Sequence, residues 1–241
     1  MSEYAESHSA QKLFGAPPGY VGYEAGGQLT NVIKEHPFSL LLFDEIEKAS
    51  SSIWDKFLQI LEDGRMTDGQ GNTVYFSESL IVFTSNLGIY KDIGGVKTRV
   101  VNINMPYEQL ESTVTEGIQE YFHQKGKPEV LNRIGKNLIV FNFIQPDAAK
   151  EIMRAQIKKI CETIKETQSI IIQLSENVWE KIEKKVLENL EEGGRGVGNV
   201  VEEYFITPLS NYVFDHHIQK GGVIHIMDIS ETDGIAKLIC G

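Results

Sequence analysis

"SLLLFDEIEKA", from Ser39 to Ala49, is the stretch of sequence that decides the fold. Four apolar residues, 40–43, end abruptly in two carboxylates, Asp44 and Glu45. A short continuous apolar run is typical of a parallel strand covered on both faces, and such strands carry functional groups at their carboxyl ends. The stretch therefore predicts an α/β sheet with two acids at its ligand-binding edge.

Two more runs have this design, "SLIVFTSNLG" at 79–88 and "NLIVFNFI" at 137–144. Strands that alternate with helices form an α/β domain. A helix with a serine cap is expected between the first two strands, in "SSSIWDKFLQILED". Its apolar residues recur at helical spacing: Ile53, Trp54, Phe57, Leu58 and Leu61.

The pattern changes after Gln145-Pro146, so we expect two domains, 1–144 and 145–241. The second domain should begin with a long helix, then a helix from about 175 to 190 ended by Gly193-Gly194, then one broken near Pro208. Two strands, "VIHIMDI" and "IAKLIC", should close the chain as a hairpin through Asp233-Gly234. The long helix has one apolar face: Ile152, Met153, Ile157, Ile160, Cys161 and Ile164.

Composition and charge exclude several classes of protein. The 241 residues carry 23 Lys and Arg against 34 Asp and Glu, a formal net charge of −11. This field repels phosphate backbones, so nucleic acid is not an expected partner. No apolar run approaches the roughly 20 residues of a membrane helix, and the polar start "MSEYAESHSA" is not a secretory signal. Two cysteines without a CxxC pair favour the reducing cytoplasm.

The acids after the first strand suit phosphate chemistry. Asp44 can hold a magnesium ion through water, and Glu45 can polarise a water for attack on a γ-phosphate. Asn86, at the end of the neighbouring strand, can orient the same water. The alternatives are acids that decorate a helix N-terminus and a polar turn at Asn86.

Two arginines suit a developing phosphoryl charge, because the guanidinium is planar, permanently charged and multidentate. Arg133 lies in "EVLNRIG" and Arg195 on the glycine loop "GGRGV". Surface ion pairs are the alternative for both, for example Arg133 with Glu129. The adjacent His216-His217 would point in different directions on a helix and predict no zinc site.

Glycine and proline make a loop of "GAPPGYVGYEAGGQ", residues 15–28, because they disfavour regular helix and strand. Its tyrosines, Tyr20 and Tyr23, either pack on a neighbouring surface or are held out for binding. Packing is the favoured interpretation for Tyr23.

Six motifs in order resemble the C-terminal ATPase module of Clp-type AAA+ unfoldases, the ClpA/ClpB/ClpC group. They are "HSAQKLFGAPPGYVGYEAGGQL", "LLLFDEIEKA", "LQILEDGRMTDGQGNTVYF", "TSNLG", "LNRI" and "GGRGV". The resemblance runs from Met1 to about Val213 and more loosely to the end. It implies an AAA+ large α/β subdomain with a parallel sheet, a small helical lid subdomain ending in a β-hairpin, and ATP with magnesium as ligands.

The resemblance also assigns roles to residues. Asp44 and Glu45 match the Walker B pair, with Asp44 on nucleotide-bound magnesium and Glu45 activating water. Asn86 matches sensor 1. Arg133 matches the arginine finger, which acts on ATP in the neighbouring subunit. Arg195 matches sensor 2, which acts on the nucleotide of its own subunit.

The loop tyrosine acquires a role from the same resemblance. Gly19, Tyr20, Val21 and Gly22 match the pore loop, in which the tyrosine faces the channel of a hexameric ring and grips an extended polypeptide. Flanking glycines would let the loop swing with the nucleotide state. "EDGRMTDGQGN" resembles a hairpin that lines a second level of the channel.

The phosphate loop of the family, G-x-x-x-x-G-K-[ST], does not occur in this sequence. In the family that loop and two strands lie upstream, so the chain looks like the module with its front removed. We expect unpaired sheet edges and no tight ATP binding by the chain alone. Peptidase docking is also not expected, because Gly95, in "DIGG", lacks the apolar side chain that the docking tripeptide needs.

The expected function is the engine of an ATP-driven protein unfoldase or disaggregase, which assembles in a ring and threads polypeptide. The alternative is a binding or regulatory module that keeps the fold, subunit interface and pore loop without hydrolysing ATP. A nucleic-acid clamp loader or helicase is disfavoured by the charge of −11.

Overall fold

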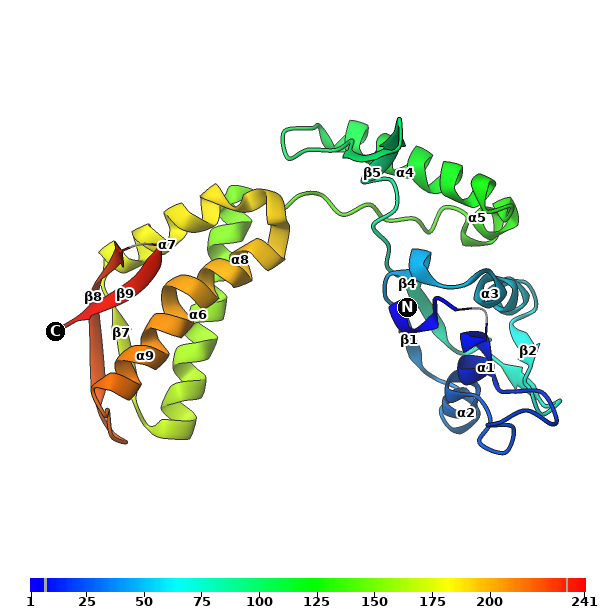
Figure 1. Cartoon of the computed structure of the whole chain (residues 1–241), viewed down its shortest axis with the longest axis horizontal. Helices are drawn as coiled ribbons and strands as arrows, with labels where there is room; N and C mark the ends of the chain where they lie inside the picture. Colours follow the sequence, from blue (N-terminus) through cyan, green and yellow to red (C-terminus); the bar gives the residue numbers. More distant parts are fainter. Residues whose placement is uncertain (7, 233) are drawn as a thin grey trace. The chain divides into compact units, whose positions relative to one another are not determined.

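A computed structural model describes residues 1–6, 8–232 and 234–241 of the chain. Asp233, half of the predicted hairpin signal, lies outside the described residues. The chain divides into two units, Met1–Phe141 and Asn142–Gly241, which Figure 1 shows in blue to green and in green to red. Each unit has its own hydrophobic core.

The first unit contains a parallel pair of strands. β1 pairs with β4 in register, with Leu40 opposite Leu80 and Phe43 opposite Phe83. This agrees with the predicted α/β class. The elements in order are η1 Ser2–Tyr4, α1 Ser9–Phe14, α2 Gln28–Glu35, β1 Leu40–Phe43, η2 Ile46–Lys48, α3 Ser51–Asp63, β2 Arg65–Thr67, β3 Thr73–Tyr75, β4 Leu80–Phe83, β5 Tyr90–Ile93, β6 Val96–Arg99, α4 Tyr107–Gln124 and α5 Pro128–Ile134.

Helix α3 supports the strand pair through aromatic contacts. The helix starts after Ser50 and ends at Gly64, whose left-handed φ of 64° suits glycine. Phe57 of α3 is fully buried, and its ring lies 4.7 Å from Phe43 and 5.1 Å from Phe83, centroid to centroid. Because these contacts are edge-to-face, they hold both strands on one helix in a defined orientation.

The other face of the strand pair is exposed, which corrects the prediction that these strands are covered on both faces. Leu40, Leu42 and Leu80 are 67%, 59% and 60% exposed. The described helices of this unit bury the side that carries Phe43, and none of them shields these leucines. The apolar run identified a strand, but it did not establish that both of its faces are covered.

The predicted strand at 137–144 is also not found. Among the described residues this segment has no regular secondary structure, and Ile139 and Phe141 are 80% and 89% exposed. Val140 is buried, and its carbonyl accepts a hydrogen bond of 3.0 Å from the Tyr107 hydroxyl. A strand needs a neighbouring strand for its backbone hydrogen bonds, and no strand of the described chain pairs with this segment.

The second unit is helical with a three-stranded sheet in the order β7-β8-β9. β8 and β9 form the predicted closing hairpin, whereas β7, which pairs in parallel with β8, was not predicted. The elements are α6 Pro146–Gln168, β7 Ile171–Leu174, α7 Glu176–Glu188, η3 Leu190–Glu192, α8 Gly193–Val201, η4 Glu202–Ile206, α9 Thr207–Asp215, β8 Val223–Thr232 and β9 Ile235–Cys240.

Two helix boundaries differ from the prediction. α7 already ends at Glu188, and the short 3-10 turn η3 follows it; Gly193, at φ 63°, is the C-cap of η3 and also begins α8. The chain also remains helical past Pro208, because the π-helical turn η4 precedes it and Pro208 falls in the first turn of α9. The proline, which has no N–H to donate, is accommodated where the hydrogen-bond pattern changes from the π-helical turn to the α-helix.

The core of the second unit gathers residues from all its helices and from the sheet. Met153, Ile157, Ile182 and Phe205 are fully buried. Cys161 packs on the edge of this core, and burial raises the pKa of its thiol to about 11. The thiol is therefore protonated at neutral pH and packs as an apolar side chain.

No helix of the described chain is long and apolar enough to cross a membrane.

We predict that Phe205→Ala destabilises the second unit by about 3–5 kcal/mol, because it leaves a cavity in a fully packed core. Each unit holds one of the two tryptophans, Trp54 and Trp179. Urea unfolding followed by Trp179 in a Trp54→Phe background should show the shift. The transition that Trp54 reports, in a Trp179→Phe background, should stay in place. Equal shifts of both transitions would contradict separate cores.

Candidate functional site

The hydrogen-bond ladder between β1 and β4 continues one step past the strands. The N–H of Thr84 donates to the Phe43 carbonyl, and the N–H of Ile46 donates to the Thr84 carbonyl, each at 3.0 Å. Asp44 and Glu45 therefore leave the sheet beside Thr84. This is the strand edge at which the sequence predicts a ligand site.

Thr84 orients the first acid. Its hydroxyl donates to Asp44 Oδ1 and accepts a hydrogen bond of 3.2 Å from the N–H of Glu45. Asp44 is exposed. An exposed carboxylate held by a neighbouring hydroxyl is an oxygen ligand of the kind that binds a hydrated Mg²⁺.

The second acid sits in a strained backbone conformation. Glu45 has φ 53° and ψ 52°, the left-handed region that costs a non-glycine residue energy. Its Oε2 accepts hydrogen bonds from Lys48 Nζ at 2.7 Å and from Ser2 Oγ at 3.1 Å. The bond from Lys48, followed by that from Ser2, lowers the pKa of Glu45, so its carboxylate is ionised at neutral pH.

Glu47 connects the two strand ends, and the sequence pattern did not predict this role. Its Oε2 accepts from Ser85 Oγ at 2.9 Å, and its Oε1 accepts from the N–H of Asn86 at 3.3 Å. Its carbonyl accepts from the Tyr121 hydroxyl at 3.0 Å. The segment that carries Asn86 is thus fixed beside Asp44 and Glu45, with the Asn86 side chain exposed.

Arg133 makes an ion pair, but with a different partner from the one that the sequence offered. From α5, its Nε and Nη2 both donate to Oε1 of Glu62 on α3, at 3.1 and 2.7 Å. Glu129 is not its partner. Both side chains are nearly half exposed, so the ion pair adds little stability. The guanidinium can exchange Glu62 for another anion at small cost.

Arg195 belongs to the second unit, in the first turn of α8. It therefore lies on a helix and not on the glycine loop that the sequence predicted. The side chain is exposed.

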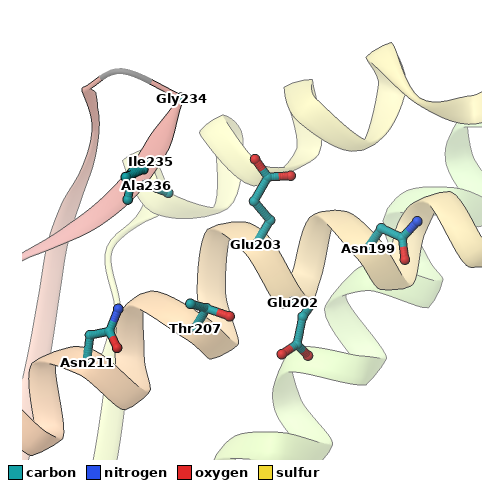
Figure 2. Close-up of a pocket in the computed structure, with 8 residues that line it drawn as sticks. All are labelled: Asn199, Glu202, Glu203, Thr207, Asn211, Gly234, Ile235 and Ala236. Carbon is teal, nitrogen blue, oxygen red and sulfur yellow. The ribbon is translucent and has the colours of Figure 1, made fainter.

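A shallow pocket of about 360 Å³ also lies in the second unit, between the α8–η4–α9 helix and β9. Glu202 and Glu203 leave the helix in different directions beside it (Figure 2). The lining combines carboxylates with the amides of Asn199 and Asn211, and it includes no cation. Because a negative lining repels phosphates, we assign this pocket no nucleotide role.

The described residues fit one half of a magnesium–nucleotide site. Asp44, Glu45 and Thr84 bring together oxygen atoms and hydrogen-bonding groups of the kind that such a site needs. The glycine loop and lysine that would hold the phosphates are not in the sequence, in which Gly126-Lys127 precedes proline and Gly135-Lys136 precedes asparagine.

The tyrosine loop joins α1 to α2 and projects Tyr20 and Val21. Tyr20 is 61% exposed and Val21 is fully exposed. Gly19 and Gly22 flank them at φ 85° and 92°, a conformation that side chains disfavour. Tyr23 is partly buried. The predicted hairpin in "EDGRMTDGQGN" is present as β2 and β3, which pair antiparallel.

Comparison with protein families agrees with this arrangement. Residues 1–137 match the family described as AAA domain (Cdc48 subfamily), and residues 144–226 match the C-terminal, D2-small domain of ClpB protein. The chain therefore belongs to the AAA+ family and joins an AAA domain to a ClpB-type small domain.

Curated relatives place the chain near the Clp chaperones. It is 38% identical to the chaperone protein ClpB of Prochlorococcus marinus over 213 residues, 88% of the chain and 23% of that relative. It is 42% identical over 181 residues to the ATP-dependent Clp protease ATP-binding subunit ClpA homolog of Cyanidium caldarium, 73% of the chain and 20% of that relative. The chain thus spans about a quarter or less of these two proteins.

We predict that Glu45→Gly is more stable than Glu45→Ala by about 1 kcal/mol, because only alanine keeps the Cβ that is strained at positive φ. Both variants lose the contacts with Lys48 and Ser2, so these losses cancel in the comparison. Urea unfolding followed by Trp54 in a Trp179→Phe background measures the difference.

Asp44 supplies the matched control, because its φ is not positive. There glycine should be less stable than alanine, owing to the larger entropy of the unfolded chain. The same order of stability at both positions would contradict strain at Glu45.

Proposed function

We propose that this chain is the engine module of an ATP-driven protein unfoldase or disaggregase. The observation that carries the proposal is an exposed tyrosine between two glycines, in the same unit as a strand-end Asp-Glu pair. An aromatic ring that no neighbour covers is suited to contact the backbone and side chains of many different polypeptides.

The chain's own residues would divide the chemistry among them. ATP with magnesium, when bound, supplies the phosphoanhydride bond whose hydrolysis releases free energy. Asp44 would hold the magnesium through water, and Asn86 would orient the attacking water. Glu45 would first release Lys48 and then accept a proton from the attacking water.

The arginines would stabilise the charge that develops on the phosphates. Arg133 would leave Glu62 and act on the nucleotide of a neighbouring subunit, and Arg195 would act on the nucleotide of its own subunit. This division requires self-association, for which we propose a hexameric ring. We also propose a boundary between a large subdomain, 1–144, and a lid, 145–241.

The proposed substrate is an extended polypeptide in the ring channel, gripped by Gly19, Tyr20, Val21 and Gly22. Nucleic acid is not proposed, given the net charge of −11. We propose a cytoplasmic location, in keeping with two free cysteines. Peptidase docking is not proposed, because Gly95, in the β5–β6 turn, lacks the apolar side chain that docking would need.

One observation favours a second function, a regulatory module that binds partners without hydrolysing ATP. The Glu45 carboxylate, which would activate the water, is engaged by Lys48 at 2.7 Å. The two functions differ in whether a supplied phosphate loop restores hydrolysis.

We predict that the 241-residue chain alone does not bind ATP with magnesium tightly, as measured by titration calorimetry. A chimera tests hydrolysis, with the chain replacing the matching segment of Prochlorococcus marinus ClpB so that the relative supplies the upstream residues. The chimera should hydrolyse ATP. Glu45→Gln should slow this hydrolysis by about 10²–10⁴-fold, as expected for loss of a general base.

Micromolar binding by the chain alone would show that it holds phosphates without the missing loop. A folded chimera that binds ATP and does not hydrolyse it would favour the regulatory function.

We predict that Tyr20→Ala in the same chimera slows unfolding of a tagged protein by about tenfold or more, as for loss of an aromatic anchor. ATP hydrolysis should persist, since the loop lies apart from Asp44 and Glu45 in the chain. Tyr20→Phe keeps the ring and should retain unfolding. If Tyr20→Ala unfolds the substrate at the unchanged rate, the pore-loop assignment is wrong.

A further inference from the structure

Asp68, in the turn between β2 and β3, is the one carboxylate buried among the described residues. Its side chain is 1% exposed. A buried carboxylate is costly unless charged and hydrogen-bonding partners surround it. Asp68 therefore marks a place where the fold depends on specific polar contacts.

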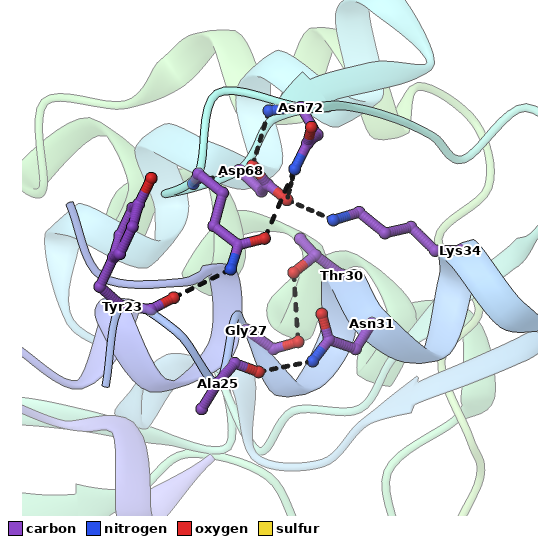
Figure 3. Close-up of polar contacts among 9 residues, drawn as sticks. Tyr23, Ala25, Gly27, Thr30, Asn31, Lys34, Asp68 and Asn72 are labelled. Carbon is purple, nitrogen blue, oxygen red and sulfur yellow. Dashed lines mark hydrogen bonds and ion pairs between the residues drawn. The ribbon is translucent and has the colours of Figure 1, made fainter. Parts of the chain in front are cut away.

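The partners of Asp68 tie its own turn to α2. Oδ1 accepts from the N–H groups of Gln70 and Asn72 at 2.9 and 2.8 Å, and Oδ2 pairs with Lys34 Nζ at 2.5 Å (Figure 3). Burial opposes ionisation of Asp68, but the bonds from Lys34 and Asn72 outweigh it and lower the pKa of the carboxyl. The carboxylate is thus charged at neutral pH and holds the turn against the helix.

The same turn holds the base of the tyrosine loop. Gln70 Nε2 donates to the Tyr23 carbonyl at 3.0 Å, and the N–H of Gly69 donates to the Phe14 carbonyl at 3.2 Å. A Cβ at Gly69 would lie 2.4 Å from the Ala16 carbonyl oxygen. Only glycine fits there, so the turn and the loop base are in direct backbone contact.

The first turns of α2 hold the end of the loop. Thr30 Oγ1 donates to the Gly27 carbonyl at 3.2 Å, and Asn31 Nδ2 donates to the Ala25 carbonyl at 2.8 Å (Figure 3). Both ends of the loop are therefore bound to α2 or to the β2–β3 turn, and Lys34–Asp68 joins these two supports. The tip, with Tyr20 61% exposed, is free of them.

We propose that Asp68 is a positioning residue for the tyrosine loop. Through Lys34 it locks the β2–β3 turn to α2, so that the loop base and the hairpin form one rigid body that carries Tyr20. This inference deepens the proposed function, because it names what aims the gripping residue and what moves with it. A shift of α2 or of the hairpin would then move the base of the loop that carries Tyr20.

Amide hydrogen exchange of the full 241-residue chain, measured by mass spectrometry, tests the Lys34–Asp68 clamp between α2 and the β2–β3 turn. It needs neither nucleotide nor substrate. Asp68→Asn should speed exchange in peptides covering residues 15–27 by about tenfold, the effect of losing one charged hydrogen bond. Exchange in α3 should not change. Asp92→Asn is the matched control, because Asp92 also accepts a turn N–H, from Gly95 at 2.8 Å, in the separate β5–β6 hairpin.

Variants of the partner separate positioning from a general loss of fold. Lys34→Met should speed amide exchange in the same peptides. Lys34→Arg keeps the charge and should therefore retain slow exchange. The double variant of Asp68→Asn with Lys34→Met should exchange no faster than the faster single variant, since both remove one interaction.

Unchanged exchange at 15–27 in both Asp68→Asn and Lys34→Met would overturn the clamp. Equal acceleration in α3 would also overturn it, because Asp68 would then support the whole unit. Neither result depends on what Tyr20 grips, so failure of the clamp is distinguishable from failure of the proposed function.

Discussion

The four-residue pairing of β1 with β4 positions the acidic site of the first unit. Two parallel strands are too few to be stable alone, and the edge-to-face contacts of Phe57 with Phe43 and Phe83 hold them on α3. The ladder then runs on through Thr84 to the N–H of Ile46, one residue past the left-handed Glu45. The backbone of the two acids is therefore placed by these hydrogen bonds and by a core beneath the strands, while Thr84, Lys48 and Ser2 orient the carboxylates.

Local patterns predicted the elements that depend on their own residues. The helix at 51–63, the long helix of the second unit and the closing β8–β9 hairpin follow from apolar spacing and turn signals, whereas the β2–β3 hairpin was expected from the family resemblance. The prediction of a strand at 137–144 was wrong because strand formation needs a neighbouring strand, which an apolar run cannot specify. The missed strand β7 is the converse case, since its short run after a long helix becomes a strand by pairing with β8, about 50 residues later.

The candidate site divides in the same way. Asp44, Glu45 and Tyr20 stand out in the sequence because their chemistry contrasts with the apolar or glycine-rich residues beside them. Glu47 and Asp68 do not, because they act across 38 and 34 residues, on Ser85 and Lys34. Sequence reasoning names groups that can do chemistry. It does not find the groups that hold them, since those are defined only by distant contacts.

A loop that grips and pulls polypeptide, as proposed for residues 15–28, would have to satisfy two opposing requirements. Its tip must adapt to many polypeptides, which requires exposure and glycine freedom, as at Gly19 and Gly22. Its base must transmit force, which requires that bound ends do not yield. A charged pair inside the fold meets the second requirement better than apolar packing, because the Lys34–Asp68 bond has a fixed direction whereas apolar contacts can slide. On this proposal, the burial cost of Asp68 is the cost of a rigid base beneath an exposed tip.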